Sequence, residues 1–383
     1  MAFLIFYTIV FAVYFAVHYY LFSRLNMVFP GNSGIALYIK TAFWVIALSF
    51  IIGRVLEKIW LSEFSMGLTV FGSYWLAAML YFLLVVLAVD IVRLINHYLP
   101  IVPAVIQNNL PAFKHYFFAV VTAAIAILLI YGHFNARQPL IRELVLEIPK
   151  SAGERDSLNM ILVSDLHLGS ILEQKHLERI AGKINGIRPD IILMAGDVID
   201  EDLDPVIRKN LGSGLKMLHA PLGVYAVTGN HEYIGGVDPA VEYLESHGVK
   251  MIRDTAILIE NSFYLLGRED RDRPRFAGKP RLELADIMIG VNKAMPLILM
   301  DHQPFSLEES RKHGIDLHLS GHTHNGQIWP LTYVIDAIYE VSHGYANKSG
   351  MHVYVSSGVG TWGPPVRIGT RPEIVQIRLK FTR

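Results

Sequence analysis

Residues 159–169 read NMILVSDLHLG, a short apolar run followed at once by an aspartate and a histidine two residues apart. A run of branched apolar residues between polar ones is typical of a buried β-strand. In extended backbone, residues i and i+2 project to the same side, so Asp165 and His167 present a carboxylate and an imidazole in one direction. The stretch therefore predicts a strand that ends in two metal-binding side chains.

The same pattern recurs four times further along the chain. The apolar runs are DIILMAG, GVYAVTG, PLILMD and DLHLSG, and a helix-like segment, LEQKHLERIAGKI, follows the first strand. The polar groups at the ends of the four runs are Asp197 and Asp200, Asn230 and His231, His302, and His322 and His324. Strands that alternate with helices predict a layered α/β domain, in which functional groups collect at the carboxyl ends of the strands.

These side chains have the chemistry of a divalent-metal centre. Carboxylate, imidazole and amide oxygen suit borderline or hard ions such as Mn, Fe or Zn. The chain has no cysteine, which excludes disulfides and thiolate chemistry. A single D-x-H or GNH is more often a capped turn, but five such strand ends in succession favour a metal site over ordinary turns.

The first third of the chain predicts a membrane domain over residues 1–134. The chain is 52% hydrophobic, and most of the apolar content precedes residue 135. Four stretches are long and apolar enough to cross a bilayer, and they lack the polar face of a globular helix. The four spans are 3–22, 35–52, 68–89 and 113–131. The proline-rich segment between the last two predicts broken structure at the membrane interface.

A polar segment over residues 135–156 is expected to link the membrane domain to a catalytic domain over 157–383. An even number of spans places the N-terminus and the catalytic domain on the same side. Lysines and arginines near the span ends are equally numerous on both sides, so the positive-inside rule selects neither. The formal net charge is zero, so the sequence lacks the excess of basic residues that is typical of nucleic-acid binders.

The five motifs, D-x-H, G-D-x-x-D, G-N-H-E, a single histidine and G-H-x-H, resemble the calcineurin-like metallophosphoesterase superfamily in their type and order. GHTHNGQIWP (321–330) and GTWGPPVRIGTRPEI (360–374) are similar to a membrane-associated bacterial branch that includes UDP-2,3-diacylglucosamine pyrophosphohydrolases, and to four-span transmembrane metallophosphoesterases. That branch usually has glycine where Asn325 stands, a difference that concerns backbone freedom more than chemistry. The resemblance implies an αββα sandwich that follows the transmembrane helices.

The resemblance also implies two divalent ions, with Mn favoured over Fe or Zn. The first ion would be held by Asp165, His167, Asp197 and His324, and the second by Asp197, Asn230, His302 and His322, with Asp197 bridging. Two such ions bind phosphoryl oxygens and lower the pKa of a water between them. His231 would then protonate the leaving group, and Asp200 would orient its ring.

Three further features bear on the substrate. Some phosphomonoesterases of the superfamily carry an arginine where Glu201 stands, so a diester or pyrophosphate substrate is favoured here. Arg367 either replaces that cation or forms a structural ion pair. The arginine-rich segment 267–281 either contacts anionic lipid headgroups or is a solvated loop. Residues 328–345 either pack as a core helix or form an apolar lip that faces the bilayer and acyl chains.

Together these features predict a metal-dependent phosphoesterase in the membrane. The expected substrate is a lipid-linked phosphodiester or pyrophosphate such as UDP-2,3-diacylglucosamine, with membrane lipids as partners and no nucleic acid. Such a nucleotide-lipid substrate favours the cytoplasmic side of a bacterial inner membrane. The alternatives are a phosphodiesterase for small soluble substrates on a membrane anchor, and a non-catalytic scaffold, against which the complete ligand set argues.

Overall fold

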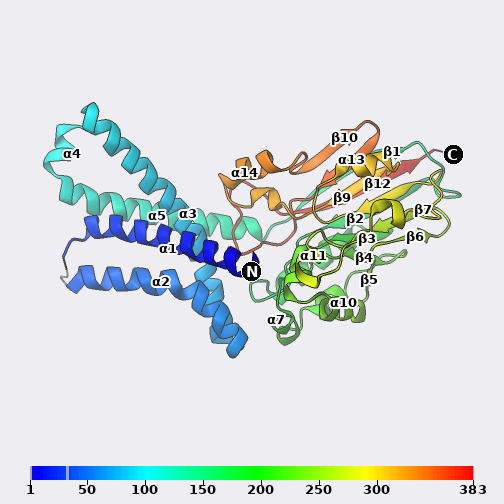
Figure 1. The fold of residues 1–383 in the computed structure, drawn as a ribbon, viewed down its shortest axis with the longest axis horizontal. Helices are drawn as coiled ribbons and strands as arrows, with labels where there is room; N and C mark the ends of the chain where they lie inside the picture. The colour runs from blue at the N-terminus through cyan, green and yellow to red at the C-terminus, as the bar shows by residue number, and fades with distance from the viewer. Residues whose placement is uncertain (1, 32–33, 383) are drawn as a thin grey trace. The chain divides into compact units, whose positions relative to one another are not determined.

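The computed structural model describes residues 2–31 and 34–382, and the chain divides into two compact units, residues 1–132 and 133–383. The first unit is helical and the second contains all the strands described (Figure 1). The predicted fold class, four long apolar helices followed by a two-sheet α/β sandwich, is confirmed.

The first unit is built from four helices that are long and apolar enough to cross a membrane. They are α1 (Ala2–Val28), α2 (Gly34–Ile59), α3 (Glu63–Tyr98) and α5 (Leu110–Ala136), with a short α4 (Ala104–Asn108) before α5. The proline-rich segment holds the end of α3, α4 and the first turn of α5. Proline lacks a backbone N–H, so α3 stops just before Leu99 and Pro100, whereas Pro111 fits the first turn of α5.

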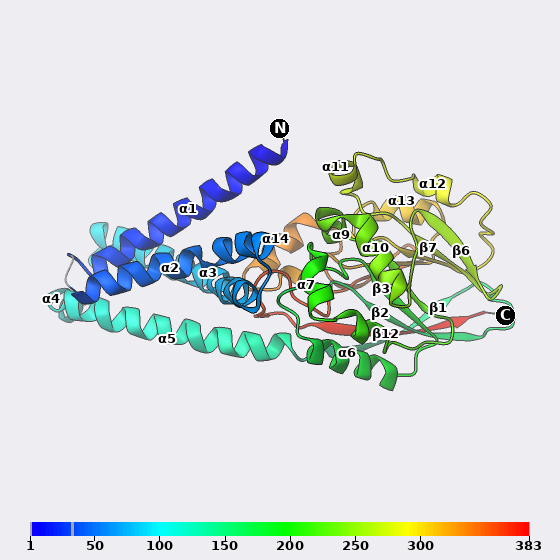
Figure 2. The same cartoon turned by 90° about the horizontal axis from the view of Figure 1, so that it is seen from below.

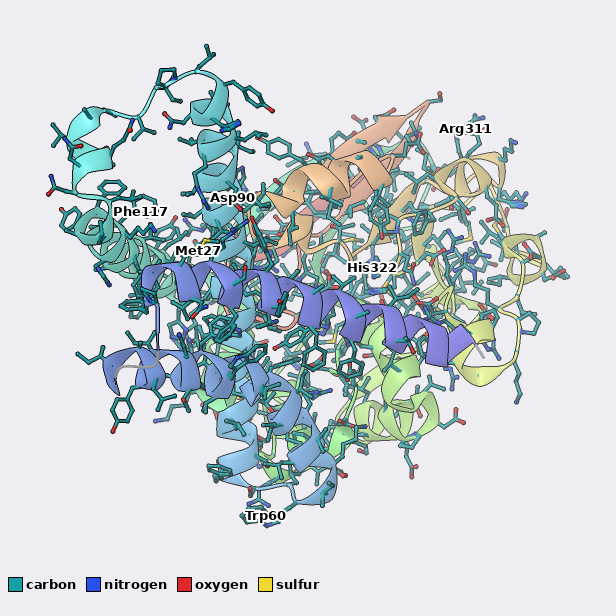
Figure 3. All side chains as sticks on the ribbon, turned by 60° about the vertical axis from the view of Figure 1, so that its left-hand side comes forward. Met27, Trp60, Asp90, Phe117, Arg311 and His322 are labelled. Carbon is teal, nitrogen blue, oxygen red and sulfur yellow. The ribbon has the colours of Figure 1, made fainter. Side chains whose placement is uncertain are left out.

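Polar side chains within this helical unit pair with one another. On α3, the Asp90 carboxylate accepts a hydrogen bond from Tyr20 and lies 2.7 Å from Arg24 and 3.2 Å from Arg93. Figure 3 labels Asp90 together with Met27, whose sulfur contacts Arg24 at 3.5 Å. Pairing charged side chains in this way lowers the free-energy cost of placing them in low-dielectric surroundings.

The second unit is a sandwich of two six-stranded sheets. The first sheet has the order β1 (Leu140–Ile148), β12 (Glu373–Phe381), β2 (Ser157–Val163), β3 (Ile191–Ala195), β4 (Val224–Val227), β5 (Val249–Met251). The second has the order β10 (Gly344–Lys348), β11 (Met351–Val355), β9 (Leu317–Ser320), β8 (Leu297–Met300), β7 (Phe263–Gly267), β6 (Thr255–Ile259). Strands β2 to β5 are parallel to one another, as are β7, β8, β9 and β11.

Side chains that alternate along each strand build the layers. On β2, Leu158, Met160 and Leu162 enter the core between the sheets, whereas Ile161 and Val163 face the helices. The described helices of this unit are α6 (Gln174–Gly186), α7 (Leu203–Arg208), α8 (Gly212–Leu215), α9 (Asn230–Gly235), α10 (Val237–Ser246), α11 (Arg273–Ala277), α12 (Leu284–Ile287), α13 (Leu307–Lys312) and α14 (Leu331–Ile338). Helices α6 and α10 cover the first sheet, and Figure 2 shows α6 beside β12 and β2. Helices α12 and α13 cover the second sheet.

Strand β1 lies inside the segment predicted as a linker. It pairs in parallel with β12 along its whole length, from Leu140 opposite Glu373 to Ile148 opposite Phe381. Strand β12 pairs on its other side with β2, in the antiparallel sense. The chain therefore enters the sandwich only a few residues after α5 ends.

Candidate metal centre

The predicted site residues lie at the carboxyl ends of five strands, β2, β3, β4, β8 and β9, where the two sheets bring their loops together. Five of them have left-handed backbone, which costs a residue with a Cβ roughly 1–2 kcal/mol. They are Asp165 (φ 53°), His167 (φ 49°), Asp197 (φ 50°), His322 (φ 72°) and His324 (φ 48°). Backbone strain of this kind clusters at functional sites, because only a demand on side-chain placement maintains it.

The first group of ligands comprises Asp165, His167 and His324, whose donor atoms all lie within 4.8 Å of one another. The Nε2 atoms of His167 and His324 are 3.0 Å apart, and Nε2 of His324 is 3.5 Å from Asp165 Oδ1. Nδ1 of His167 lies 3.3 Å from the Asp200 carboxylate, a neighbour that favours the tautomer with Nε2 free to bind a metal.

The second group comprises Asp197, His302 and His322, and Asn230 joins it. Nε2 of His302 lies 3.1 Å from Asp197 Oδ2 and 3.2 Å from Asn230 Oδ1. Nδ1 of His322 lies 2.9 Å from the same amide oxygen. Because Nδ1 of His302 donates to the carbonyl of Ala195 at 2.7 Å, its Nε2 is a free lone pair aimed at the group.

Asp197 stands between the two groups. Its Oδ2 is 3.1 Å from His302 and 3.9 Å from His167, which belong to different groups. Its Oδ1 accepts the backbone N–H of His231 at 2.9 Å, which fixes the plane of the carboxylate. Two lone-pair nitrogens 3.0 Å apart beside buried carboxylates repel one another unless a cation lies between them, so the donor set fits two divalent ions.

Asp200 contacts two histidines at once. Its Oδ1 is 3.0 Å from Nδ1 of His231 as well as 3.3 Å from Nδ1 of His167. Burial opposes ionisation, yet the hydrogen bonds from the two rings hold the pKa of Asp200 below its usual range. Burial likewise would lower the pKa of His231, but Asp197 and Asp200 outweigh it and raise that pKa to about 9. Nε2 of His231 is left to face the site.

Glu232 is a buried organising residue whose role the motifs alone do not reveal. Its carboxylate accepts the backbone N–H groups of Gly229 at 2.7 Å, Ile199 at 2.8 Å and Asp197 at 3.2 Å. It therefore fastens the GNHE loop to the GDVID loop. The glutamate directly after His231 is the signal from which this role could have been inferred.

Arg367 contacts the candidate site from inside the fold, with one guanidinium nitrogen 3.3 Å from Nδ1 of His324. It is fully buried, and its guanidinium donates to the carbonyls of Ser357 at 2.6 Å, Gly360 at 2.7 Å and His324 at 3.3 Å. Burial lowers its pKa to about 10. The prediction that Arg367 supplies a cation to the substrate is therefore wrong, since its donors are taken up by the loops that carry the ligands.

The arginines of segment 267–281 mostly pair with acids of the same unit. Arg268 lies 3.1 Å from Glu309, Arg273 lies 2.9 Å from Asp254, and Arg281 lies 3.0 Å from Asp301. These pairs favour the solvated, internally paired loop over a headgroup-binding loop.

Residues 328–345 divide into a buried start and an exposed helix. Ile328 is 5% exposed and bridges to Ile368, so it belongs to the core. No residue of α14 is buried, and Leu331, Val334 and Ile338 are 40%, 53% and 55% exposed. The core-helix alternative is therefore wrong for α14, which presents apolar side chains from the segment directly after His324.

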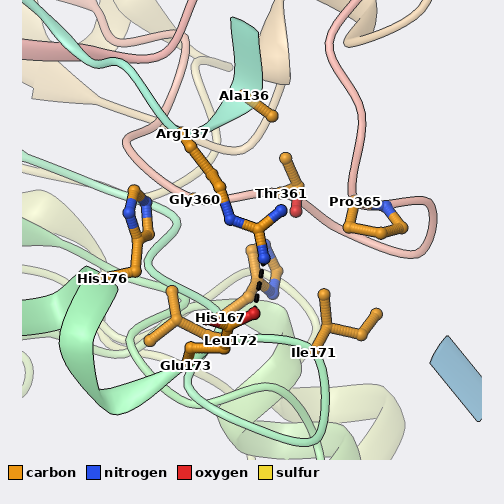
Figure 4. Close-up of a pocket in the computed structure, with 10 residues that line it drawn as sticks. All are labelled: Ala136, Arg137, His167, Ile171, Leu172, Glu173, His176, Gly360, Thr361 and Pro365. Atoms are coloured by element: carbon orange, nitrogen blue, oxygen red, sulfur yellow. Dashed lines mark hydrogen bonds and ion pairs between the residues drawn. The ribbon is translucent and has the colours of Figure 1, made fainter. Parts of the chain in front are cut away.

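A small cavity lies beside His167 (Figure 4). Its wall includes Thr361 and the ion pair between Arg137 and Glu173, whose atoms are 2.6 Å apart. At about 30 Å³ it has room for roughly one water molecule, so it is no substrate pocket.

A two-sheet α/β sandwich whose strand ends carry overlapping clusters of His and Asp side chains defines the class of the protein: it is a dimetal phosphoesterase, a metal-dependent hydrolase. The calcineurin-like phosphoesterase family matches residues 158–326. An "Uncharacterized metallophosphoesterase" of Aquifex aeolicus is 30% identical over 259 residues, which cover 67% of this chain and 98% of the relative. The chain thus belongs to the calcineurin-like metallophosphoesterase family.

Other similar proteins align with part of this chain. A "Transmembrane protein with metallophosphoesterase domain" of Danio rerio is 31% identical over 67% of this chain and 61% of its own length. An "Uncharacterized metallophosphoesterase" of Helicobacter pylori is 34% identical over 63% of this chain and 64% of its own. Among solved structures, a 5'-nucleotidase precursor from Thermus thermophilus aligns with a TM-score of 0.36 at 12% identity, covering 58% of this chain and 55% of that one.

Proposed function

We propose that the protein hydrolyses a phosphodiester or pyrophosphate bond of a lipid-linked substrate, such as the nucleotide-diphospho lipid UDP-2,3-diacylglucosamine. The observation that carries this proposal is the exposed apolar helix α14, which follows the metal-binding His324 within a few residues. Each methylene of an acyl chain buried against it contributes about 0.8 kcal/mol, so a few contacts can decide the choice of substrate.

The site also suits the proposed reaction. Asp165, His167, Asp197 and His324 would hold one ion, and Asp197, Asn230, His302 and His322 the other. The ions, for which Mn is our first choice, supply charge neutralisation at the phosphoryl group and a nucleophile from water. The Asp197 and Asp200 carboxylates favour the doubly protonated ring of His231, so Nε2 of His231 can deliver a proton to the leaving-group oxygen.

The point at which the chain enters the catalytic unit supports a substrate that lies in the membrane. In the last turn of α5, the Asn135 amide donates to the carbonyls of Arg367 at 2.9 Å and Thr370 at 2.8 Å. Ile328 forms a β-bridge with Ile368, which lies between Arg367 and Thr370 in the sequence. Helix α14 begins three residues after Ile328. Within the catalytic unit, the end of a membrane-type helix and the apolar α14 are therefore fastened to the same loop.

The proposal is tested with purified full-length protein in detergent, loaded with Mn²⁺ and incubated with a bacterial lipid extract. Mass spectrometry should reveal new phosphorylated products that are absent with the metal-free protein. Substituting Val334→Asp or Ile338→Asp should lower hydrolysis of the diacyl substrate at least tenfold more than hydrolysis of a small soluble diester. Ile289→Asp, at a position that is 79% exposed just after α12, is the matched control.

If the α14 variants lower both activities in parallel, the lipid substrate is wrong and small soluble diesters become the substrate class. The dimetal phosphoesterase assignment would stand in either case, because it rests on the metal ligands rather than on α14.

A further inference from the structure

Trp362 is a large aromatic residue that lies beside His231 and is 55% exposed. The ring centroids of Trp362 and His231 are 5.9 Å apart, and the ring planes meet at 73°. An exposed tryptophan beside a candidate proton donor offers an apolar face that a ligand can cover.

The backbone of Trp362 is held on both sides by one buried side chain. The amide of Gln327 accepts the N–H of Trp362 at 2.9 Å and donates to its carbonyl at 2.9 Å. The same amide nitrogen donates to the carbonyl of Pro364 at 2.9 Å. Gln327 follows the metal-binding histidines closely in sequence, so this clamp fixes the tryptophan relative to the ligand loop.

The loop that carries Trp362 also packs on the D-x-H segment. Gly360 donates its N–H to the carbonyl of Asp165 at 3.0 Å. A Cβ at position 360 would lie only 2.3 Å from the carbonyl oxygen of Leu166, so the backbones approach too closely for any residue but glycine. A rigid aromatic side chain next to a reacting group is suited to binding, because it loses little entropy when a ligand arrives.

The position of the ring indicates what it would contact. Nδ1 of His231 lies 3.0 Å from the Asp200 carboxylate, so the proton for the leaving group would come from Nε2, which must come within about 3 Å of the leaving-group oxygen. A group attached to that oxygen that extends toward Trp362 would then reach the indole, whose ring centroid is 5.9 Å from that of the imidazole. The residue beside the proton donor is thus the residue beside the leaving group.

We propose that Trp362 forms a leaving-group subsite, which selects a leaving group with a ring next to its bridging oxygen over one with an open alkyl chain. This inference rests on the proposed function only through the role of His231 as the proton donor. It adds a residue that discriminates among leaving groups, separate from the apolar helix α14.

The test measures binding of two non-hydrolysable phosphonates to the Mn²⁺-loaded, detergent-solubilised full chain by calorimetry. Benzylphosphonate places a methylene where the bridging oxygen lies and a ring next to it, and n-butylphosphonate places an open alkyl chain next to the same methylene. We expect the wild type to prefer benzylphosphonate by about 3- to 10-fold, the affinity ratio expected for an aromatic pair. Trp362→Ala should abolish the preference, and Trp362→Phe should keep most of it.

Trp60, 61% exposed in the helical unit, provides the control, because Trp60→Ala removes an exposed tryptophan elsewhere and should leave the preference unchanged. A wild type without a preference, or a Trp362→Ala variant that keeps it, would overturn the subsite. Failure of the protein to hydrolyse any lipid would leave this binding preference intact, so the two proposals can fail separately.

Discussion

Asp197 is the residue on which both metal groups depend, because its two carboxylate oxygens contact His302, His167 and the backbone of His231. Substituting Asp197→Ala should remove both ions and activity together. Elemental analysis after dialysis should give less than one metal per chain. Asp204→Ala, an exposed acidic residue at the start of α7, should retain both ions, which separates loss of the bridge from loss of an acidic side chain. Two ions retained by Asp197→Ala would contradict the bridging role.

The proposed role of His231 as the proton donor can also be tested by substitution. Because its ring sits between Asp200 and Trp362 and contacts no metal group through Nε2 in the proposed arrangement, His231→Asn should keep the metal content. Turnover should fall by about 10²–10⁴-fold, the usual contribution of general acid catalysis. The loss should shrink for a nitrophenyl ester, whose leaving group needs no proton. An equal loss for good and poor leaving groups would assign His231 to another role.

Side-chain identity made the clustering of these groups predictable, since carboxylates, imidazoles and an amide at successive strand ends have few other uses together. The residues around them were not predictable in the same way. Glu232, Gln327 and Arg367 act through backbone groups that are distant in sequence, and a sequence shows no partner for a hydrogen bond to a carbonyl. A role carried by side-chain chemistry can be predicted from the sequence, whereas a role carried by hydrogen bonds to a loop backbone cannot.

At the scale of elements, Arg367 ties the GHTH loop to the loop after β11. Arg367→Met keeps the volume but leaves the carbonyls of Ser357 and Gly360 without a donor, at about 1–3 kcal/mol each. Thermal unfolding followed by circular dichroism should therefore show a loss of several degrees, while the exposed Arg371→Met should change little. An unchanged midpoint for Arg367→Met would mean that water replaces the guanidinium.

The strands differ in how clearly their sequences predicted them. Strands β2, β3 and β8 are buried on both faces and read as continuous apolar runs, which is why their ends could be located. Strand β1 is an edge strand with Ile141 and Val145 exposed, so its pattern is too mixed to distinguish it from a polar linker. The burial of helix α14 was ambiguous in the sequence, because an apolar segment does not show whether other elements pack against it.

For the whole molecule, four spans predict that the N-terminus and the catalytic unit share one side of the membrane, while α4 lies on the other. The chain contains no native cysteine, so single cysteines can be introduced at Val105 and at Asp204 without a background signal. With the catalytic unit in the cytoplasm, a membrane-impermeant maleimide should label position 105 in intact cells and position 204 only after lysis. Labelling of both from one side would contradict the four-span arrangement. A reversed pattern would contradict only the cytoplasmic placement.

Strand β12 also has a consequence for how the protein is made. It lies between β1 and β2, yet the ribosome synthesises β2 by residue 163 and reaches β12 only at residue 373. During that interval the nascent chain holds β1 and β2 with open edges and apolar faces, the condition in which chains aggregate. Translation speed and chaperone supply should therefore limit the yield of this protein more than the stability of the finished sandwich does.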